Sequence, residues 1–476
     1  MNREKNLAKN TIIITIGKVC TQMITFFLLP LYTGILSTEE YGTIDLLNTI
    51  VSLLLPIVTF QVEQALFREL IEVRENEQKK TNIISSGFFS VIIQCSVYLL
   101  IFAIIYPFIT NRYKIFLATN VISYIFSSLF LQISRGLGEN KKYSLASFIS
   151  AFSTILFNIL FLVVIKLNAY GMLLGTMLGQ VTCILYLFVS LNLFKYISIK
   201  SFSKKIVTGL WKYSVPLIPN AISWWVFNAS DRVIVSSILG LSYNGILSAS
   251  TRFSSVYITL YNIFNISWTE SISIHINDVD IREYFCRVFN IILKFFISIA
   301  LMMIACMPFI YPLMVNIKFI DGYNLVPILI LASLFNVVVG LISVIYVAKK
   351  NTKAIANTSI ISAIINIVTH LILIKYIGLY AAVISTFISF FTMSIYRLYD
   401  IRKKYFRIEI RKSLVVLSII ILIPILFAFY IENIYLRICA LLISVIYSVI
   451  LNKEVIRKGI KILKNVVLNN RGSELK

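Results

Sequence analysis

Residues 324–353 read NLVPILILASLFNVVVGLISVIYVAKKNTK, an apolar run of helix-spanning length that ends in a cluster of lysines. About 20 such residues cross a bilayer as a helix, because a helix satisfies its own backbone hydrogen bonds in hydrocarbon. Runs of this kind recur from Thr11 to Leu451. Of the 476 residues, 58% are hydrophobic and 14% charged, which excludes a soluble globular protein. The sequence therefore predicts an all-α, polytopic membrane protein.

We predict about fourteen transmembrane helices with both termini in the cytoplasm. They are expected at 11–36, 42–66, 83–106, 115–134, 144–165, 170–192, 213–239, 244–270, 286–315, 324–347, 355–375, 379–399, 413–431 and 434–452. Lysine and arginine gather in alternate loops, and such residues stay on the cytoplasmic side. A missed helix would invert every later loop, so the alternation favours an even number of spans. The same loop charges account for the formal net charge of +23 without nucleic acid as a partner.

The chain also repeats itself weakly, at a spacing of roughly 205–210 residues. GILS at 34–37, followed by YG at 41–42, is echoed by SILG at 237–240 and YNG at 243–245. Both copies begin on the cytoplasmic side, which predicts two parallel six-helix halves related by an axis along the membrane normal. The predicted parts are an N-terminal lobe 1–205, a C-terminal lobe 206–405, an extra helix pair 406–452 and a basic amphipathic cytoplasmic tail 453–476.

Several kinds of chemistry have no sequence support. No GxxxxGK phosphate loop occurs, so the chain is not expected to hydrolyse ATP. No metal-site spacing surrounds His275 or His370, and neither a metal nor another cofactor is expected. The predicted outer loops are short, whereas a membrane glycosyltransferase or polymerase needs a long loop that carries catalytic residues. The pattern favours a transporter over an enzyme.

Ionisable residues inside predicted spans are the informative positions, because each costs at least about 2.5 kcal/mol at the bilayer centre unless it is paired or hydrated. They are Lys18, Glu63, Asp231, Arg232, Arg252 and Lys294. Helical depth predicts two pairs, Lys18 with Glu63 and Asp231 with Arg252, whereas Lys294 lies near a helix end and snorkels to the interface. One interpretation is that the pairs only lock helices together. The other is that they line a water-filled cavity and bind charge.

The cavity candidates hold more cations than anions, which favours a phosphate over a cationic substrate. The cations are Lys18, Arg232 and Arg252, and the anions are Glu63 and Asp231. Amide and aromatic side chains suited to sugar hydroxyls and ring faces lie in the same spans: Gln22, Gln61, Asn228, Trp224 and Trp225. For the two tryptophans, ordinary packing or interfacial anchoring is an equal alternative.

Short motifs in both halves resemble those of the Wzx-type polysaccharide biosynthesis flippases, members of the multidrug/oligosaccharidyl-lipid/polysaccharide exporter superfamily. In the first half they are KNT at 9–11, Gly17, LPLY at 29–32, LS at 36–37 and EYG at 40–42. In the second half they are PLIP at 216–219, Asp231-Arg232, Gly240 and YNG at 243–245. The resemblance covers essentially the whole chain.

The resemblance implies two six-helix lobes around a cavity lined by spans one, two, seven and eight. It further implies that an undecaprenyl-diphosphate-linked oligosaccharide moves from the inner to the outer leaflet of the bacterial inner membrane by alternating access. Lys18 and Arg252 match cationic cavity positions of the family, whereas Glu63 stands where a lipid II flippase carries arginine. An O-antigen, capsule or related repeat unit is therefore favoured over lipid II.

The same resemblance implies that the extra helix pair helps to form a groove for the lipid tail. Glu63 and Asp231 are expected to tune the cations or to accept a coupling H+ or Na+, and membrane lipids and a polysaccharide polymerase are candidate partners. Pro216 and Pro219 are expected to bend span seven. The main alternative is a cation-coupled multidrug exporter of the same superfamily, which predicts twelve spans and a dominant buried acidic cluster.

Overall fold

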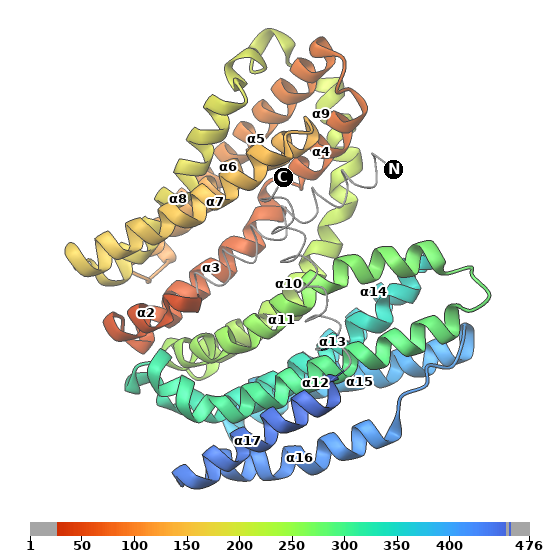
Figure 1. The fold of residues 1–476 in the computed structure, drawn as a ribbon. Coiled ribbons are helices and arrows are strands. Elements are labelled where there is room, and N and C mark those ends of the chain that lie inside the picture. The colour runs from red at the N-terminus through yellow and green to blue at the C-terminus, as the bar shows by residue number, and fades with distance from the viewer. Residues whose placement is uncertain (1–25, 454–456, 458–476) are drawn as a thin grey trace, which may run out of the picture. The chain divides into compact units, whose positions relative to one another are not determined.

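The computed structural model describes residues 26–453 and Arg457, and every regular element in that part of the chain is a helix (Figure 1). Eleven of these helices are long and apolar enough to cross a membrane. The prediction of an all-α polytopic membrane protein is thus confirmed. Most of the predicted first span, 11–36, and of the tail 453–476 lies outside the described residues, so the total of about fourteen spans stays a prediction.

The described chain divides into two compact units, with the boundary between Ala249 and Ser250. The first unit holds α2 (Leu29–Ile35), α3 (Thr38–Val58), α4 (Val62–Glu72), α5 (Glu77–Ile105), η1 (Tyr106–Phe108), α6 (Lys114–Gly136), α7 (Asn140–Ile159), η2 (Leu160–Val164), α8 (Asn168–Ser190), η3 (Leu193–Lys195), η4 (Ile199–Ser201), α9 (Lys204–Ser214), η5 (Val215–Leu217) and α10 (Ile218–Ile238). It also includes the first turns of α11 (Leu241–His275), which continues into the second unit. The predicted lobes, which follow the sequence repeat rather than packing, stay a prediction.

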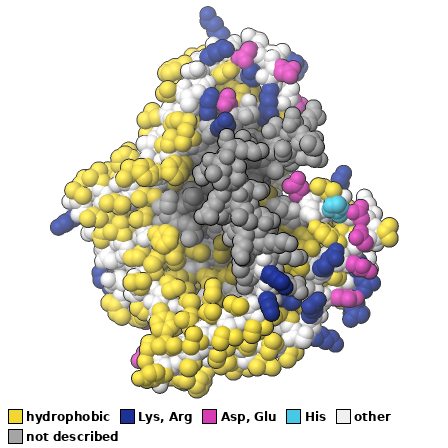
Figure 2. Space-filling view, in the orientation of Figure 1, with side chains coloured by type: hydrophobic (Ala, Val, Ile, Leu, Met, Phe, Trp, Pro, Cys, Tyr) yellow, Lys and Arg dark blue, Asp and Glu magenta, His cyan; other side chains and the backbone are white. Residues whose placement is uncertain are grey.

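The second unit continues with α12 and the helices after it. They are α12 (Ile281–Met314), η6 (Ile317–Leu325), α13 (Val326–Ala348), α14 (Thr352–Ile377), α15 (Tyr380–Lys404), α16 (Lys412–Tyr430) and α17 (Ile434–Leu451). α15 packs against both α13 and α14, and the predicted extra pair, α16 and α17, packs against α12. Hydrophobic side chains cover broad areas of the helices, as a bilayer requires, with charged side chains gathered mainly toward their ends (Figure 2).

The second predicted span, 42–66, is two helices rather than one. α3 ends at Val58 and α4 begins at Val62, and the backbone between them turns through left-handed φ values of 50° at Phe60 and 56° at Gln61. The Thr59 hydroxyl stabilises this break, because it accepts a hydrogen bond from Gln61 N at 3.1 Å. Left-handed backbone is uncommon outside glycine, so nothing in the composition of the span indicated the break.

α7 and α8 pack along each other through small residues of α8. A Cβ added to Gly175 would lie 2.1 Å from Asn158 Oδ1, and one added to Gly179 would lie 1.8 Å from Thr154 Oγ1. Glycines four residues apart thus let the two helices approach closely, as is common between membrane helices. This pair gives the first unit a tightly packed framework against which α3 and α6 are positioned.

Arg397 falls inside the predicted span 379–399, but it was not counted among the ionisable residues of the spans. It lies in α15 with only 2% of its surface exposed. Its guanidinium donates to Thr358 Oγ1 of α14 at 2.7 Å, to Ser359 Oγ at 3.3 Å and to Ser343 Oγ of α13. Hydroxyl groups on two neighbouring helices therefore make the burial of this charge possible.

Candidate functional site

α10 lies antiparallel to α3, and three side-chain contacts run the length of their seam. We refer to α3, α10 and the first turns of α11 as the seam. From one end to the other, α10 and the turn before it contribute Arg232, Trp225 and Leu217. The seam lies wholly within the first unit. Three of the ten candidate site residues make these contacts: Arg232 and Trp225 of α10, and Gln61, which follows the end of α3.

Arg232 forms an ion pair with Asp45 of α3, with Nε 2.9 Å from Oδ2. The arginine side chain is 31% exposed and the aspartate side chain 10%. In such a partly desolvated place each charge is costly alone, so the two side chains hold each other. Asp45 was not among the predicted site residues. The guanidinium still reaches the surface of the first unit, and it presents the fork geometry that suits a phosphate.

Trp225 fixes the middle of the seam. Its indole Nε1 donates to Thr49 O at 2.8 Å and to Ser52 Oγ at 3.1 Å. Trp225 and Arg232 are seven residues apart, which is about two helical turns, so both face α3. The Trp225 side chain is half-buried, so part of the ring packs against the protein and part of it stays accessible to a ligand.

Gln61 holds the other end of the seam. Its side-chain amide donates to Leu217 O at 3.2 Å, at the start of α10. The left-handed turn at Phe60 and Gln61 directs the amide to that carbonyl. Pro216 lies in η5 and Pro219 in the first turn of α10, so the predicted bend of span seven coincides with a short 3-10 turn ahead of the helix.

The two repeat motifs meet where α3 and α11 begin. Asn244 Nδ2 donates to Gly42 O at 2.8 Å, and the hydroxyls of Thr38 and Ser242 lie 2.6 Å apart. A Cβ on Gly42 would lie 1.9 Å from Leu241 O, and one on Gly245 would lie 2.0 Å from Thr38 O. The backbones touch here only because both positions are glycine. We refer to this set of contacts as the glycine crossing.

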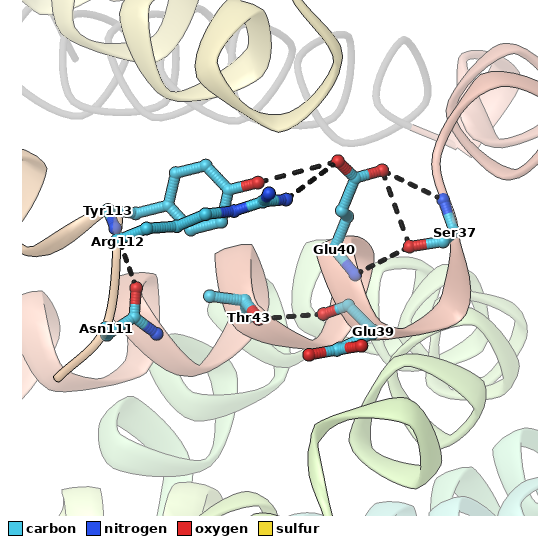
Figure 3. Close-up of polar contacts among 7 residues, drawn as sticks. All are labelled: Ser37, Glu39, Glu40, Thr43, Asn111, Arg112 and Tyr113. Carbon is cyan, nitrogen blue, oxygen red and sulfur yellow. Dashed lines mark hydrogen bonds and ion pairs between the residues drawn. The ribbon is translucent and has the colours of Figure 1, made fainter.

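A polar cluster fixes the N-terminus of α3 beside the glycine crossing (Figure 3). Ser37 and Glu40 form a capping box, with Glu40 N donating to Ser37 Oγ at 3.1 Å and Ser37 N donating to Glu40 Oε2 at 3.2 Å. Glu40 Oε1 also pairs with Arg112 Nη2 at 3.2 Å. Burial first, and then the Glu40 carboxylate, raise the pKa of Tyr113, so its phenol stays a proton donor toward Glu40.

Glu63 is the most buried acidic residue of the predicted site. It lies in the first turn of α4 and is 3% exposed. Within the described part of the chain, its Oε2 has no hydrogen-bond partner. Its predicted partner, Lys18, lies outside the described residues. A buried carboxylate of this kind requires a proton, a cation or a basic side chain.

The remaining predicted residues are placed only in part. Lys18 and Gln22 lie outside the described residues. Trp224 and Asn228 lie in α10, where the structure describes their backbone. Asp231 of α10 and Arg252 of α11 are half-buried, and each belongs to a different unit, so their pairing stays a prediction.

The seam includes polar residues that the sequence reasoning missed, namely Asp45, Ser52, Thr38, Ser242 and Asn244. Asp45 lies inside the predicted span 42–66 and was still omitted, although the cost of an ionisable residue in a span applies to it. The glycine crossing had a signal as well, because YG at 41–42 and YNG at 243–245 were recognised as repeats but not as contacts. Among the described residues, no group of three or more His, Cys, Asp or Glu side chains is arranged to hold a metal ion.

The chain matches a family model described as polysaccharide biosynthesis protein over residues 7–272. No curated protein sequence matches it.

The fold is that of solved transporters. A structure of the lipid II flippase MurJ in an inward closed conformation superposes with a TM-score of 0.70 at 19% identity, and covers 94% of this chain and 100% of that one. A multidrug resistance MATE family transporter of the MOP superfamily gives a TM-score of 0.61 at 13% identity, over 82% and 98% of the two chains. A MOP superfamily transporter from Pyrococcus furiosus gives 0.51 at 14% identity, over 83% and 94%. At these identities the likeness establishes the multi-pass transporter fold.

Proposed function

Because the chain belongs to the polysaccharide biosynthesis protein family, we propose that it moves an undecaprenyl-diphosphate-linked oligosaccharide across the bacterial inner membrane. The cargo is an O-antigen, capsule or related repeat unit, carried from the cytoplasmic to the outer leaflet by alternating access. Both termini of the chain lie in the cytoplasm. The observation that carries the proposal is the Arg232–Asp45 pair, a guanidinium held within a seam between two helices of a membrane protein.

Arg232 is the proposed diphosphate ligand of the seam. Asp45 neutralises it in the conformation described, so the arginine is kept in place without substrate. A diphosphate carries more negative charge than one carboxylate and can accept both arms of the guanidinium fork. Substrate binding would therefore exchange Asp45 for phosphate, with Lys18 and Arg252 adding further positive charge.

The sugar part of the substrate would contact the aromatic and amide side chains. Trp225 offers a half-buried ring, and Gln61 offers an amide whose bond to Leu217 O can be exchanged for a hydroxyl group. Trp224, Asn228 and Gln22 are proposed for the same task. The prenyl chain would stay in lipid, which allows a charged path without a sealed pore.

Glu63 is the proposed coupling carboxylate, with Asp231 as a second one. The Glu63 carboxyl is almost fully buried, and one of its oxygens lacks a hydrogen bond within the described residues. Such a group responds strongly to a proton or Na+, because either one removes the cost of an unpaired buried charge. A polysaccharide polymerase is the proposed protein partner that consumes the product.

The glycine crossing is the proposed outer closure. The loops before α3 and α11 are predicted to face the outside, and the contact there is made by backbone and small polar groups. When the contact opens, water can replace the hydrogen bonds that these groups make with each other. The net free-energy cost of opening is therefore small. Opening of this contact would release the oligosaccharide outward.

Transport in proteoliposomes tests the proposal. The substrate is a polyprenyl-diphosphate oligosaccharide, and a membrane-impermeant glycan probe reports its leaflet. We expect protein-dependent movement that falls at least tenfold in Arg232→Ala and persists in the control Arg112→Ala, whose side chain is 62% exposed. Movement of cationic dyes under an ion gradient, without movement of the lipid-linked glycan, would instead establish the multidrug exporter suggested by the MATE fold.

A further inference from the structure

The segment between α8 and α10, residues 191–217, is bound to α5 by a pair of buried serines. We call this segment the linker. Ser85 Oγ donates to Tyr196 O at 2.6 Å and accepts from Ser198 N at 3.0 Å, and Ser86 Oγ accepts from Ser203 N at 3.0 Å. Both serines are fully buried. The linker backbone is therefore held at a defined height along α5.

That height is the boundary between the apolar and polar parts of α5. Ser85 lies eight residues after the helix start at Glu77, about 12 Å along the axis. The apolar span of this helix is predicted to begin at residue 83. The linker therefore runs at the level where the hydrocarbon core meets the headgroups, on the side that the loop charges assign to the cytoplasm.

The outward side chains of the linker suit this place. Phe194 is 77% exposed, Ile199 78% and Phe202 40%, so large apolar groups remain uncovered by protein. Exposed lysines alternate with them: Lys195, Lys200, Lys204 and Lys205. Apolar side chains interspersed with lysine are typical of a segment that lies in the interface of an anionic membrane.

An open apolar groove of about 540 Å³ lies next to the linker, between α5, α6 and α8. Four of its eleven lining residues are phenylalanines, namely Phe88 of α5, Phe126 and Phe130 of α6, and Phe188 of α8, and Leu185 of α8 also lines it. Its volume is within the ~300–1,000 Å³ of small-molecule sites. The groove is open, and its lining residues come from apolar membrane helices, with Leu185 of α8 58% exposed, so an apolar chain of the bilayer is the ligand that fits it.

Aromatic contacts connect the groove to the linker at two points. The Phe188 ring lies 4.4 Å from that of Phe194, which precedes Lys195. Phe88 contacts Phe89 at 5.7 Å, and Phe89 contacts Phe202 at 6.3 Å, close before Lys204. A lipid chain in the groove would thus have its headgroup at the level of the lysines.

We infer that the groove and the linker form a binding site for one anionic phospholipid of the cytoplasmic leaflet. An acyl chain fills the phenylalanine groove and the phosphate contacts the linker lysines. The positive charge of the linker favours an anionic headgroup. Lys195 forms an ion pair with Glu77 of α5. Lys200, Lys204 and Lys205 form no ion pair within the described residues, so they are placed to attract a lipid phosphate. The site is independent of the transported substrate.

The acyl part of the site is tested by Leu185→Trp, which fills the groove from a lipid-facing position that is 58% exposed. Leu156→Trp, at a position of α7 that is 50% exposed and outside the groove, is the matched control. Native mass spectrometry of the delipidated full chain gives the affinity for phosphatidylglycerol and for phosphatidylcholine with identical acyl chains. We expect Leu185→Trp to weaken both lipids at least tenfold and Leu156→Trp to weaken neither. Equal affinities in the two variants would overturn the groove assignment.

The headgroup part is tested by Lys200→Gln/Lys204→Gln/Lys205→Gln. Its control, Lys141→Gln/Lys350→Gln/Lys403→Gln, removes the same charge from exposed lysines elsewhere. We expect the linker variant to lose up to about fivefold in phosphatidylglycerol affinity per lysine, with phosphatidylcholine unchanged. Equal affinity of the wild type for both headgroups would overturn the anionic assignment. A clear preference for a polyprenyl phosphate over phosphatidylglycerol would overturn the phospholipid assignment and identify the carrier lipid as the occupant.

Discussion

Gly42 of α3 and Gly245 of α11 lie so close that a Cβ on Gly42 would be 2.7 Å from Gly245 N, and a Cβ on Gly245 would be 3.0 Å from Gly42 N. The two residues occupy equivalent places in the sequence repeat. The repeat thus brings its own copies together, and the beginnings of two helices pack backbone to backbone. The proposed outer closure depends on this relationship.

Gly245→Ala is expected to force the glycine crossing apart. Its methyl group would lie 2.0 Å from Thr38 O, and a backbone carbonyl can move away only if the helices separate. We expect a loss of about 1–3 kcal/mol in stability, as for other overpacked contacts. Thermal unfolding in detergent and the spacing of spin labels on α3 and α11 provide the measurements.

Gly34→Ala is the control for this substitution. Gly34 is also helical, but among the described residues no atom lies within 4 Å of its added Cβ. Alanine there should be neutral or stabilising by up to about 1 kcal/mol. If Gly245→Ala behaved like Gly34→Ala in both measurements, the close packing at the crossing would be refuted.

The Arg232–Asp45 pair is expected to show energetic coupling. Arg232→Gln and Asp45→Asn should each destabilise the protein, and the double variant should lose less than the sum, with a coupling of about 1–2 kcal/mol for a pair that is partly exposed. The Arg112–Glu40 pair, with the arginine 62% exposed, should couple by less than about 1 kcal/mol. Additive effects at Arg232 and Asp45 would mean that the 2.9 Å contact carries no energy.

Trp225→Phe separates the indole hydrogen bonds from the ring. It removes the donor to Thr49 O and Ser52 Oγ and keeps an aromatic side chain in the seam. A stability loss of about 1 kcal/mol is expected, together with slower transport. Trp211→Phe removes one indole bond, to Ser90 Oγ, away from the seam. It should cost a similar amount of stability and leave transport rates unchanged, and a transport defect of equal size in both variants would argue against a specific role of Trp225.

Arg397→Met tests the buried guanidinium of the second unit. The substitution leaves the hydroxyls of Thr358 and Ser343 without their donor, so we expect a loss of about 2–4 kcal/mol in thermal unfolding. Arg397→Lys should not restore stability, because an ammonium group lacks the fork that reaches two helices. Arg402→Met, at an exposed position five residues further along α15, should change stability by less than about 0.5 kcal/mol. Equal unfolding temperatures for Arg397→Met and the wild type would contradict the network.

The helices followed from composition, because a long apolar run has few alternatives to a membrane helix. Arg397 shows the limit of this reasoning. It was not counted among the ionisable residues of the spans, and its partners Ser343 and Thr358 are 54 and 39 residues away. Contacts of that range depend on tertiary packing, which no local pattern reveals.

The site was predictable in its types of residue but not in its pairings. Arg232, Trp225 and Gln61 were singled out as cavity residues, which stays a prediction, and the structure shows that each has a polar partner, as polar groups in apolar helices require. Their partners lie 156 to 187 positions away along the chain, at Leu217 for Gln61, Thr49 for Trp225 and Asp45 for Arg232. The left-handed turn that directs the Gln61 amide lies at Phe60 and Gln61. Residues other than glycine rarely adopt this conformation, so no pattern in the sequence indicated the turn.

A reversible lock across the glycine crossing tests whether this contact must open for the lipid-linked glycan to be transported. The hydroxyls of Thr38 and Ser242 lie 2.6 Å apart, so cysteines there can form a disulfide with its bond of about 2.05 Å. Thr38→Cys/Ser242→Cys is prepared in a background without the six native cysteines, and transport of the lipid-linked glycan is measured in proteoliposomes. We predict that oxidation stops transport and that a reductant restores it. Transport by the fully oxidised protein at the rate of the reduced one would show that the glycine crossing does not open during transport.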